Sequence, residues 1–273
     1  SYQNKKTRGE LMASKINFPK IKPFNNKSQV TIFIILGLII VVIVILFFLL
    51  RAPPTVRTFN EDEPQAYIES CTREAVEKAI NLTSTHGGDI EPKGFINYLS
   101  QDITYLCYQN KFYDPCINQR PLLIEHLEKE ITNYISPIVE RCFNELKRNF
   151  EKRYNVEMES QMQLTTDLQS KNINIKINRD FKATRGEISQ DFKKFEMNLK
   201  SPLYNFAEIA MEIVNQETHF CNFDVIGYMF LHPEYDVIKF ITGDSDIIYV
   251  ITERSTDQKF NFAVRGCVMP PSF

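Results

Sequence analysis

The longest hydrophobic pattern in the chain is an apolar run of 21 residues, 30–50, that contains no charged side chain. At about 1.5 Å rise per residue, a helix of this length spans roughly 30 Å, the hydrocarbon thickness of a bilayer. The run also lacks the polar face of a helix in a soluble core. Because backbone amides in lipid must be paired within the segment, the pattern predicts a transmembrane helix over residues 29–51.

The next elements follow from helical periodicity. Pro53 and Pro54 end the first helix, because proline lacks an amide donor and disfavours helical geometry before it. A polar linker is expected over residues 52–62. Pro64, preceded by three acidic residues, is typical of a helix start, and Gly87-Gly88 of a helix end. Between them, apolar residues recur at helical spacing, which predicts an amphipathic helix.

Residues 89–119 are rich in aromatic side chains and include the segment ITYLCYQNKFY, which is typical of two short strands around residues 109–111. A second long helix is predicted over residues 121–150, where apolar residues form one stripe. Pro137 lies inside this stripe and is expected to kink the helix or to break it in two.

After Tyr154 the hydrophobic period changes to two. Ile173, Ile175 and Ile177 alternate with polar residues, and residues 192–199 repeat the pattern, which predicts neighbouring antiparallel strands. Helices are expected from Pro202 and over residues 222–232. Three alternating runs at the end, separated by turn-forming residues, predict an antiparallel meander over residues 235–241, 247–253 and 260–265.

Segregated helices and antiparallel strands predict an α+β class. The default organisation is one domain over residues 63–273, which is long enough for a sizeable core. A division near Tyr154 stays open.

Charge gives the orientation of the predicted span. Residues 1–28 contain seven Lys and Arg residues and one acid, Glu10, a net charge of +6 in a chain whose total is −2. Lys and Arg near a span stay on the cytoplasmic side, so we expect a basic cytoplasmic tail over residues 1–28 and an extracytoplasmic domain after the helix. The expected location is the cell membrane, crossed once. The run is too long for a cleaved signal peptide, so it is interpreted as a retained anchor.

The cysteines are consistent with this orientation. All six follow the predicted span, where an oxidising compartment allows disulfides. Six cysteines allow fifteen pairings, and spacing does not choose among them rigorously. The favoured pairing joins two predicted helices, closes a short hairpin-like loop, and ties the last helix to the final strand: Cys71 with Cys142, Cys107 with Cys116, and Cys221 with Cys267.

Several segments are similar to proteins of one group. The membrane entry KSQVTIFIILG at residues 27–37, the Glu69-Ser70-Cys71 helix ending in Gly87-Gly88-Asp89-Ile90, and the later helix with Cys142 resemble single-pass surface proteins of small-genome archaea. These proteins are largely of unknown function. The resemblance implies an archaeal cell-envelope location and adds no catalytic assignment.

The anchor also resembles archaeal type IV pilin precursors, in which a basic leader precedes a glutamine-led hydrophobic helix. Here Gln29 would follow the cleavage point. Phe33 stands where such helices usually place an acid, and Pro53-Pro54 ends a helix that in pilins continues into the head. A pilin-like filament subunit is therefore an alternative, not the leading interpretation.

The sequence contains no pattern that predicts a catalytic residue, a metal site or a cofactor. Its four histidines lie outside the zinc-protease and nucleophile-elbow motifs, and Walker and dinucleotide-binding loops are absent. Asp244 and Asp246 are expected in a hairpin turn, with calcium binding as the alternative. Asn81-Leu82-Thr83 is a glycosylation sequon late in a helix.

The leading hypothesis is a non-catalytic envelope protein that binds another envelope or membrane protein as part of a surface assembly. A membrane-anchored surface hydrolase stays a further alternative; it would need carboxylates and a histidine to converge in a cleft. No nucleic-acid partner is expected, and a homo-oligomer is left open. Interface cores favour aromatic residues, so the candidate partner-binding residues are Tyr105, Tyr108, Phe112 and Tyr113.

Overall fold

The computed structural model describes residues 34–44 and 63–270, which fall in two compact units, Ser1–Thr58 and Phe59–Phe273. In the first unit, residues 34–44 form an α-helix with exposed side chains. The remainder of the predicted membrane segment, the basic tail and the linker lie outside the described residues. Among residues 34–44 and 63–270, no helix combines the length and apolar composition that crossing a bilayer requires.

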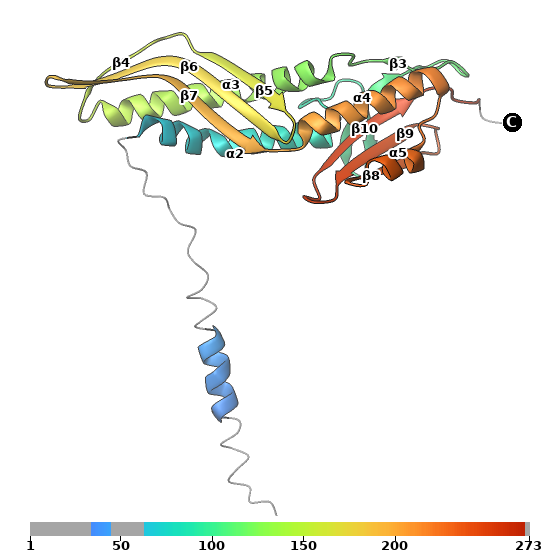
Figure 1. Cartoon of the computed structure of the whole chain (residues 1–273), viewed down its shortest axis with the longest axis horizontal. Coiled ribbons are helices and arrows are strands. Elements are labelled where there is room, and N and C mark those ends of the chain that lie inside the picture. The colour runs from blue at the N-terminus through green and yellow to red at the C-terminus, as the bar shows by residue number, and fades with distance from the viewer. Residues whose placement is uncertain (1–33, 45–62, 271–273) are drawn as a thin grey trace, which may run out of the picture. The chain divides into compact units, whose positions relative to one another are not determined.

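The second unit, called the head below, is built on two long antiparallel helices, α2 (Pro64–Thr85) and α3 (Leu123–Phe150), as Figure 1 shows. The disulfide Cys71–Cys142 joins them, with 6.0 Å between the Cα atoms. Each helix buries one stripe, as its periodicity predicts. On α3 the stripe includes Leu127, Ile131 and Ile135, none of which is exposed to solvent.

Helix α3 passes through Pro137 without a break, so the expectation of two pieces is wrong. Proline removes one helical hydrogen bond and leaves a carbonyl free four residues earlier. Here Pro137 and Asn133 are both exposed, so water can solvate that carbonyl. The buried side chains on either side, Ile135 and Val139, hold the helix to the core. Tertiary packing therefore outweighs the local cost of proline.

The first sheet contains strands β4 to β7. Their bounds are β4 Asn155–Met158, β5 Gln163–Gln169, β6 Asn172–Arg185 and β7 Ile188–Lys200. Strands β6 and β7 form a long hairpin in which Ile173, Ile175 and Ile177 pair with Leu199, Met197 and Phe195, as the period of two predicts. These side chains are buried beneath the sheet, where β5 packs on α3 and β7 on α2.

An ion pair between a buried guanidinium and a partly exposed carboxylate fixes this sheet to α3. The Arg179 guanidinium on β6 donates two hydrogen bonds to the Glu140 carboxylate, at 2.7 and 3.0 Å, and its Nε donates to the Glu159 carbonyl. It also lies over the Phe143 ring, 5.1 Å from the centroid. A charge in a core is tolerated when its donors are satisfied in this way.

The second sheet has the order β1-β2-β10-β9-β8, with β3 paired to β2. The strand bounds are β1 Phe95–Tyr98, β2 Gln101–Tyr108, β3 Ile117–Asn118, β8 Tyr235–Ile241, β9 Ile247–Glu253 and β10 Lys259–Arg265. The last three form the predicted antiparallel meander. Sequence periodicity does not reveal the parallel pairing of β10 with β2, in which Ala263 lies opposite Tyr105.

Helices α4 (Leu203–Phe220) and α5 (Val225–Leu231) accompany this sheet. Glu217, buried on α4, accepts hydrogen bonds from Tyr249 on β9 and from Lys239 on β8, the latter at 3.0 Å. Burial and the bond to this carboxylate raise the pKa of Tyr249, so the phenol keeps its proton and donates. The contact ties α4 to β8 and β9, the first two strands of the meander.

The described part of the chain is therefore α+β, with sheets rich in antiparallel pairs and three disulfides. The disulfide partners are those favoured from the sequence, Cys71 with Cys142, Cys107 with Cys116, and Cys221 with Cys267.

A buried carboxylate holds the end of α2, the start of α3 and β2 together. Asp89, only 4% exposed, follows the Gly87-Gly88 turn that ends α2. It accepts hydrogen bonds from Thr104 (3.1 Å) and Arg120 (3.1 Å), and its Oδ1 lies 2.5 Å from His126 Nε2. Burial disfavours the charged carboxylate, but the bond to His126 and the charge of Arg120 outweigh it and lower the pKa of Asp89.

We predict that Asp89→Asn lowers the free energy of unfolding at pH 7 by about 2 kcal/mol, because it removes a paired buried charge. A lowered carboxyl pKa contributes stability above its unfolded value, about 3.9, which is lost as the pH falls through the folded value. The difference between the two proteins should thus shrink below about pH 4. Urea unfolding at pH 7 and at acidic pH measures it, with the exposed Asp191→Asn as the control. Equal stability of Asp89→Asn and wild type at pH 7 would contradict this role.

Candidate functional site

The candidate site begins at the end of β2, where a disulfide closes a short loop. Cys107 and Cys116 are both buried, and their Cα atoms lie 5.3 Å apart. The disulfide encloses residues 108–115, which we call the aromatic loop. After it, β3 pairs antiparallel with the end of β2, Ile117 opposite Tyr108. The predicted strand–loop–strand arrangement is present, but the second strand starts later than expected, so Phe112 and Tyr113 lie in the loop.

The aromatic loop is fixed to the C-terminal segment by three backbone hydrogen bonds. The Gln109 amide donates to the Arg265 carbonyl (2.8 Å) and the Tyr113 amide to the Val268 carbonyl (3.0 Å). In return the Cys267 amide donates to the Asp114 carbonyl (2.7 Å). Because Cys267 is also disulfide-bonded to Cys221 after α4, the loop is tied to two other parts of the head.

Gly266 makes the closest approach between the two segments. A Cβ atom at this position would lie 2.7 Å from the Cys116 amide nitrogen and 2.8 Å from its Cβ. Only glycine fits there without moving one backbone away from the other. The spacing between the aromatic loop and the C-terminal segment therefore depends on this residue.

Aromatic side chains gather where the loop meets β1 and β2. Phe112 is 47% exposed and Tyr113 67%, and Phe95 and Tyr108 are also exposed. The rings of Tyr105 and Tyr108 meet edge to face, with centroids 5.1 Å apart. All of these except Tyr113 line a hollow of about 580 Å³, whose other walls include Asp244, Asp246, Arg265 and Met269.

Hydrogen bonds connect the polar residues in the wall of this hollow. Arg265 donates to the Asp246 carboxylate (2.9 Å) and to the Asp244 carbonyl (2.9 Å). The bond to Asp246 raises the pKa of Arg265. Burial, followed by the charge and hydrogen bond of Asp246, raises the pKa of Tyr105, which therefore keeps its proton. Calcium binding would need the Asp246 carboxylate, which already accepts a hydrogen bond from Arg265.

The structure separates the four candidate partner-binding residues. Tyr108, Phe112 and Tyr113 present exposed rings, whereas Tyr105 is half-buried on β2 and belongs to the Asp246 network. Tyr105 thus contributes little exposed area to the aromatic surface and instead contacts Asp246 at its base. Phe95 joins the surface from the neighbouring strand β1, and Met269 joins it from a distant part of the chain that no local pattern identifies.

A second hollow, about 520 Å³, adjoins the same aromatic residues. Phe95, Tyr105 and Tyr108 line it together with Lys93, Thr104 and Arg120. Arg120 is held by Asp89 from below, at 3.1 Å. The aromatic surface therefore has a basic border on this side, which resembles the polar rim around an interface core.

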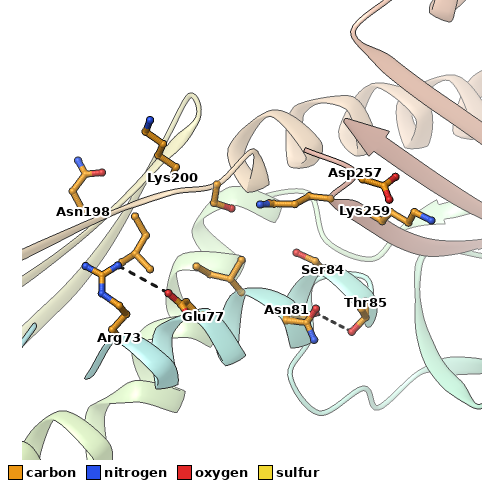
Figure 2. A pocket seen from close by; sticks show the side chains of 13 residues that line it. Arg73, Glu77, Asn81, Ser84, Thr85, Asn198, Lys200, Asp257 and Lys259 are labelled. Carbon is orange, nitrogen blue, oxygen red and sulfur yellow. Dashed lines mark hydrogen bonds and ion pairs between the residues drawn. The ribbon is translucent and has the colours of Figure 1, made fainter. Parts of the chain in front are cut away.

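Figure 2 shows a third hollow, of about 780 Å³, which is lined mostly by polar and charged residues together with Ile80 and Leu199. Arg73 and Glu77 from α2 face each other at 4.0 Å, with Asn198 and Lys200 of β7 on one side and Asp257 and Lys259 on the other. No aromatic side chain lines it. Asn81, the first residue of the glycosylation sequon, also lines this hollow. The hydroxyl of Thr83, the third residue of the sequon, is buried and donates to the Ala79 carbonyl (3.0 Å).

The pair of Asp89 and His126 is where a histidine and a carboxylate converge from distant positions. Asp89 is buried, and neither residue lines the hollows described above. Within residues 63–270 no hydroxyl or thiol hydrogen-bonds to the His126 ring, so the pair lacks a nucleophile. Nor do the described residues contain a group of three or more His, Cys, Asp and Glu side chains placed to hold a metal.

The chain matches no protein-family model, and comparison with curated proteins and with solved structures finds no match.

We predict that Gly266→Ala lowers the free energy of unfolding by about 1–3 kcal/mol, because the added methyl group forces the Cys116 backbone away. The loop should also be cleaved faster by trypsin after Lys111, as its ties to the C-terminal segment loosen. Gly243→Ala is the matched control, because its methyl group would meet no atom within 4 Å. Chemical denaturation and limited proteolysis measure both effects. The same result for the two variants would show that the close approach is unimportant.

Proposed function

We propose that this chain is a single-pass, membrane-anchored protein of the cell envelope, with a cytoplasmic basic tail and an extracytoplasmic head. The apolar run at residues 30–50 and the excess of Lys and Arg before it support this topology. Three disulfides in the head support an oxidising compartment. The resemblance of residues 27–37 to archaeal surface proteins supports an archaeal envelope.

Within this proposal, the head is a non-catalytic module that binds another envelope or membrane protein through the aromatic loop. The observation that carries it is the combination of exposed rings at Phe112 and Tyr113 with a backbone held by a disulfide and three hydrogen bonds. A loop that is already ordered loses little conformational entropy on binding. Large aromatic side chains on such a loop supply the contact area of an interface hot spot.

The hydrolase alternative lacks a supporting observation, since Asp89 and His126 stay in a buried network. The filament alternative depends on processing before Gln29 and is decided by the same experiment as the leading proposal.

The test places a photo-crosslinking amino acid at Phe112 or at Tyr113 in the full chain in its native membranes. A control at Ile188 is at least as exposed as either loop position but lies on the β6–β7 hairpin. We expect one adduct of defined mass from positions 112 and 113 and none from 188. Phe112→Ser should lower the yield of the adduct formed from position 113 about tenfold, as expected for loss of a hot-spot side chain.

Absence of adducts at both loop positions would contradict the proposed interface. Adducts made only of copies of this chain, together with an N-terminus at Gln29 by mass spectrometry, would favour the filament subunit. An intact basic tail with a different protein in the adduct would support the leading proposal.

A further inference from the structure

Helix α5 carries the two most exposed large apolar side chains of the head's C-terminal half, Ile226 and Phe230, and a third, Leu231, beside them. Ile226 is 78% exposed, Phe230 84% and Leu231 73%. Ile226 and Phe230 are four residues apart and thus lie on one face of the helix. Single exposed apolar residues are common, but three large ones within a helix of seven residues form a patch that indicates a binding surface.

The opposite face of α5 is firmly attached, so the patch is held outward by a fixed element. Tyr228 is buried, and its ring lies near that of Phe223, with centroids 5.4 Å apart. The Val237 amide of β8 donates to the Met229 sulfur at 3.3 Å. At the start of the helix, the Asp224 carboxylate accepts from the Gly227 amide at 3.0 Å. Burying the patch within the head would require breaking these contacts.

We propose that α5 inserts Ile226, Phe230 and Leu231 into the outer leaflet of the bilayer that anchors the chain. This inference rests on the proposed membrane topology. Twelve residues separate position 50 from position 63 and span at most about 40 Å, so the head is kept at the membrane surface.

The charges around the patch favour a neutral lipid surface. Asp224, Glu234 and Asp236 flank α5 in the sequence, with His232 as the nearby titratable base. Anionic headgroups would therefore gain little attraction here, and insertion would depend on apolar area rather than on salt. The predicted ligand is a zwitterionic bilayer surface.

The chain contains no tryptophan, so one substitution provides a specific reporter. Phe230→Trp is introduced into the full chain, which is reconstituted in phosphatidylcholine liposomes with or without brominated acyl chains. We expect blue-shifted emission that the brominated lipid quenches about twofold or more, because an interfacial helix places its apolar face at the acyl boundary. Ile226→Trp should behave alike. Ile188→Trp, 70% exposed at the distant hairpin, should emit as in water and stay unquenched.

Emission of Phe230→Trp that matches water and is unquenched would overturn the proposal. A blue shift without quenching by lipid would also overturn it and would indicate burial against protein, such as a second copy. Alkaline carbonate extraction of the same liposomes tests the membrane anchor independently of the contact between α5 and lipid. Release of the chain by carbonate would refute the membrane anchor itself, whereas a retained chain with an unquenched reporter would refute only the contact of α5.

Discussion

The packing of α2 against α3 is the interaction on which the rest of the head depends. The two helices share a continuous buried stripe, and Cys71–Cys142 joins them near the end where α3 finishes. Strand β7 packs on α2, β5 packs on α3, and β10 of the second sheet also contacts α2. Both sheets therefore use the same helix pair as a support. A disulfide within this pair limits the unfolded ensemble and adds to a stability that the buried stripe already provides.

The second level of organisation is the attachment of the aromatic loop to the C-terminal segment. Parallel pairing of β10 with β2 brings the end of the chain beside the loop, and Gly266 allows the two backbones to meet. The Cys107–Cys116 disulfide closes the aromatic loop, and the Cys221–Cys267 disulfide joins the C-terminal segment to the end of α4. Two of the three disulfides therefore lie at the proposed binding surface, and the third lies within the helix pair.

Local patterns predict those parts of the fold that depend on local physics. The alternation of Ile173, Ile175 and Ile177 identifies a half-buried strand because side chains alternate across a sheet, and Gly87-Gly88 ends α2 because both residues adopt positive φ. The passage of α3 through Pro137 is not predictable locally, since packing on both sides determines it. The same holds for the site. Phe112 and Tyr113 are found from composition, but Phe95, Asp246, Arg265 and Met269 reach it through strand pairings that the sequence period does not encode.

We propose that an extracytoplasmic, disulfide-bonded head follows a membrane anchor. To test this, intact cells are treated with a membrane-impermeant protease, free thiols are blocked without reductant, and the peptides are mapped by mass spectrometry. We expect the head to be cleaved from outside and its six cysteines to be recovered as the pairs Cys71–Cys142, Cys107–Cys116 and Cys221–Cys267. A head protected from the protease with its cysteines recovered as free thiols would contradict it.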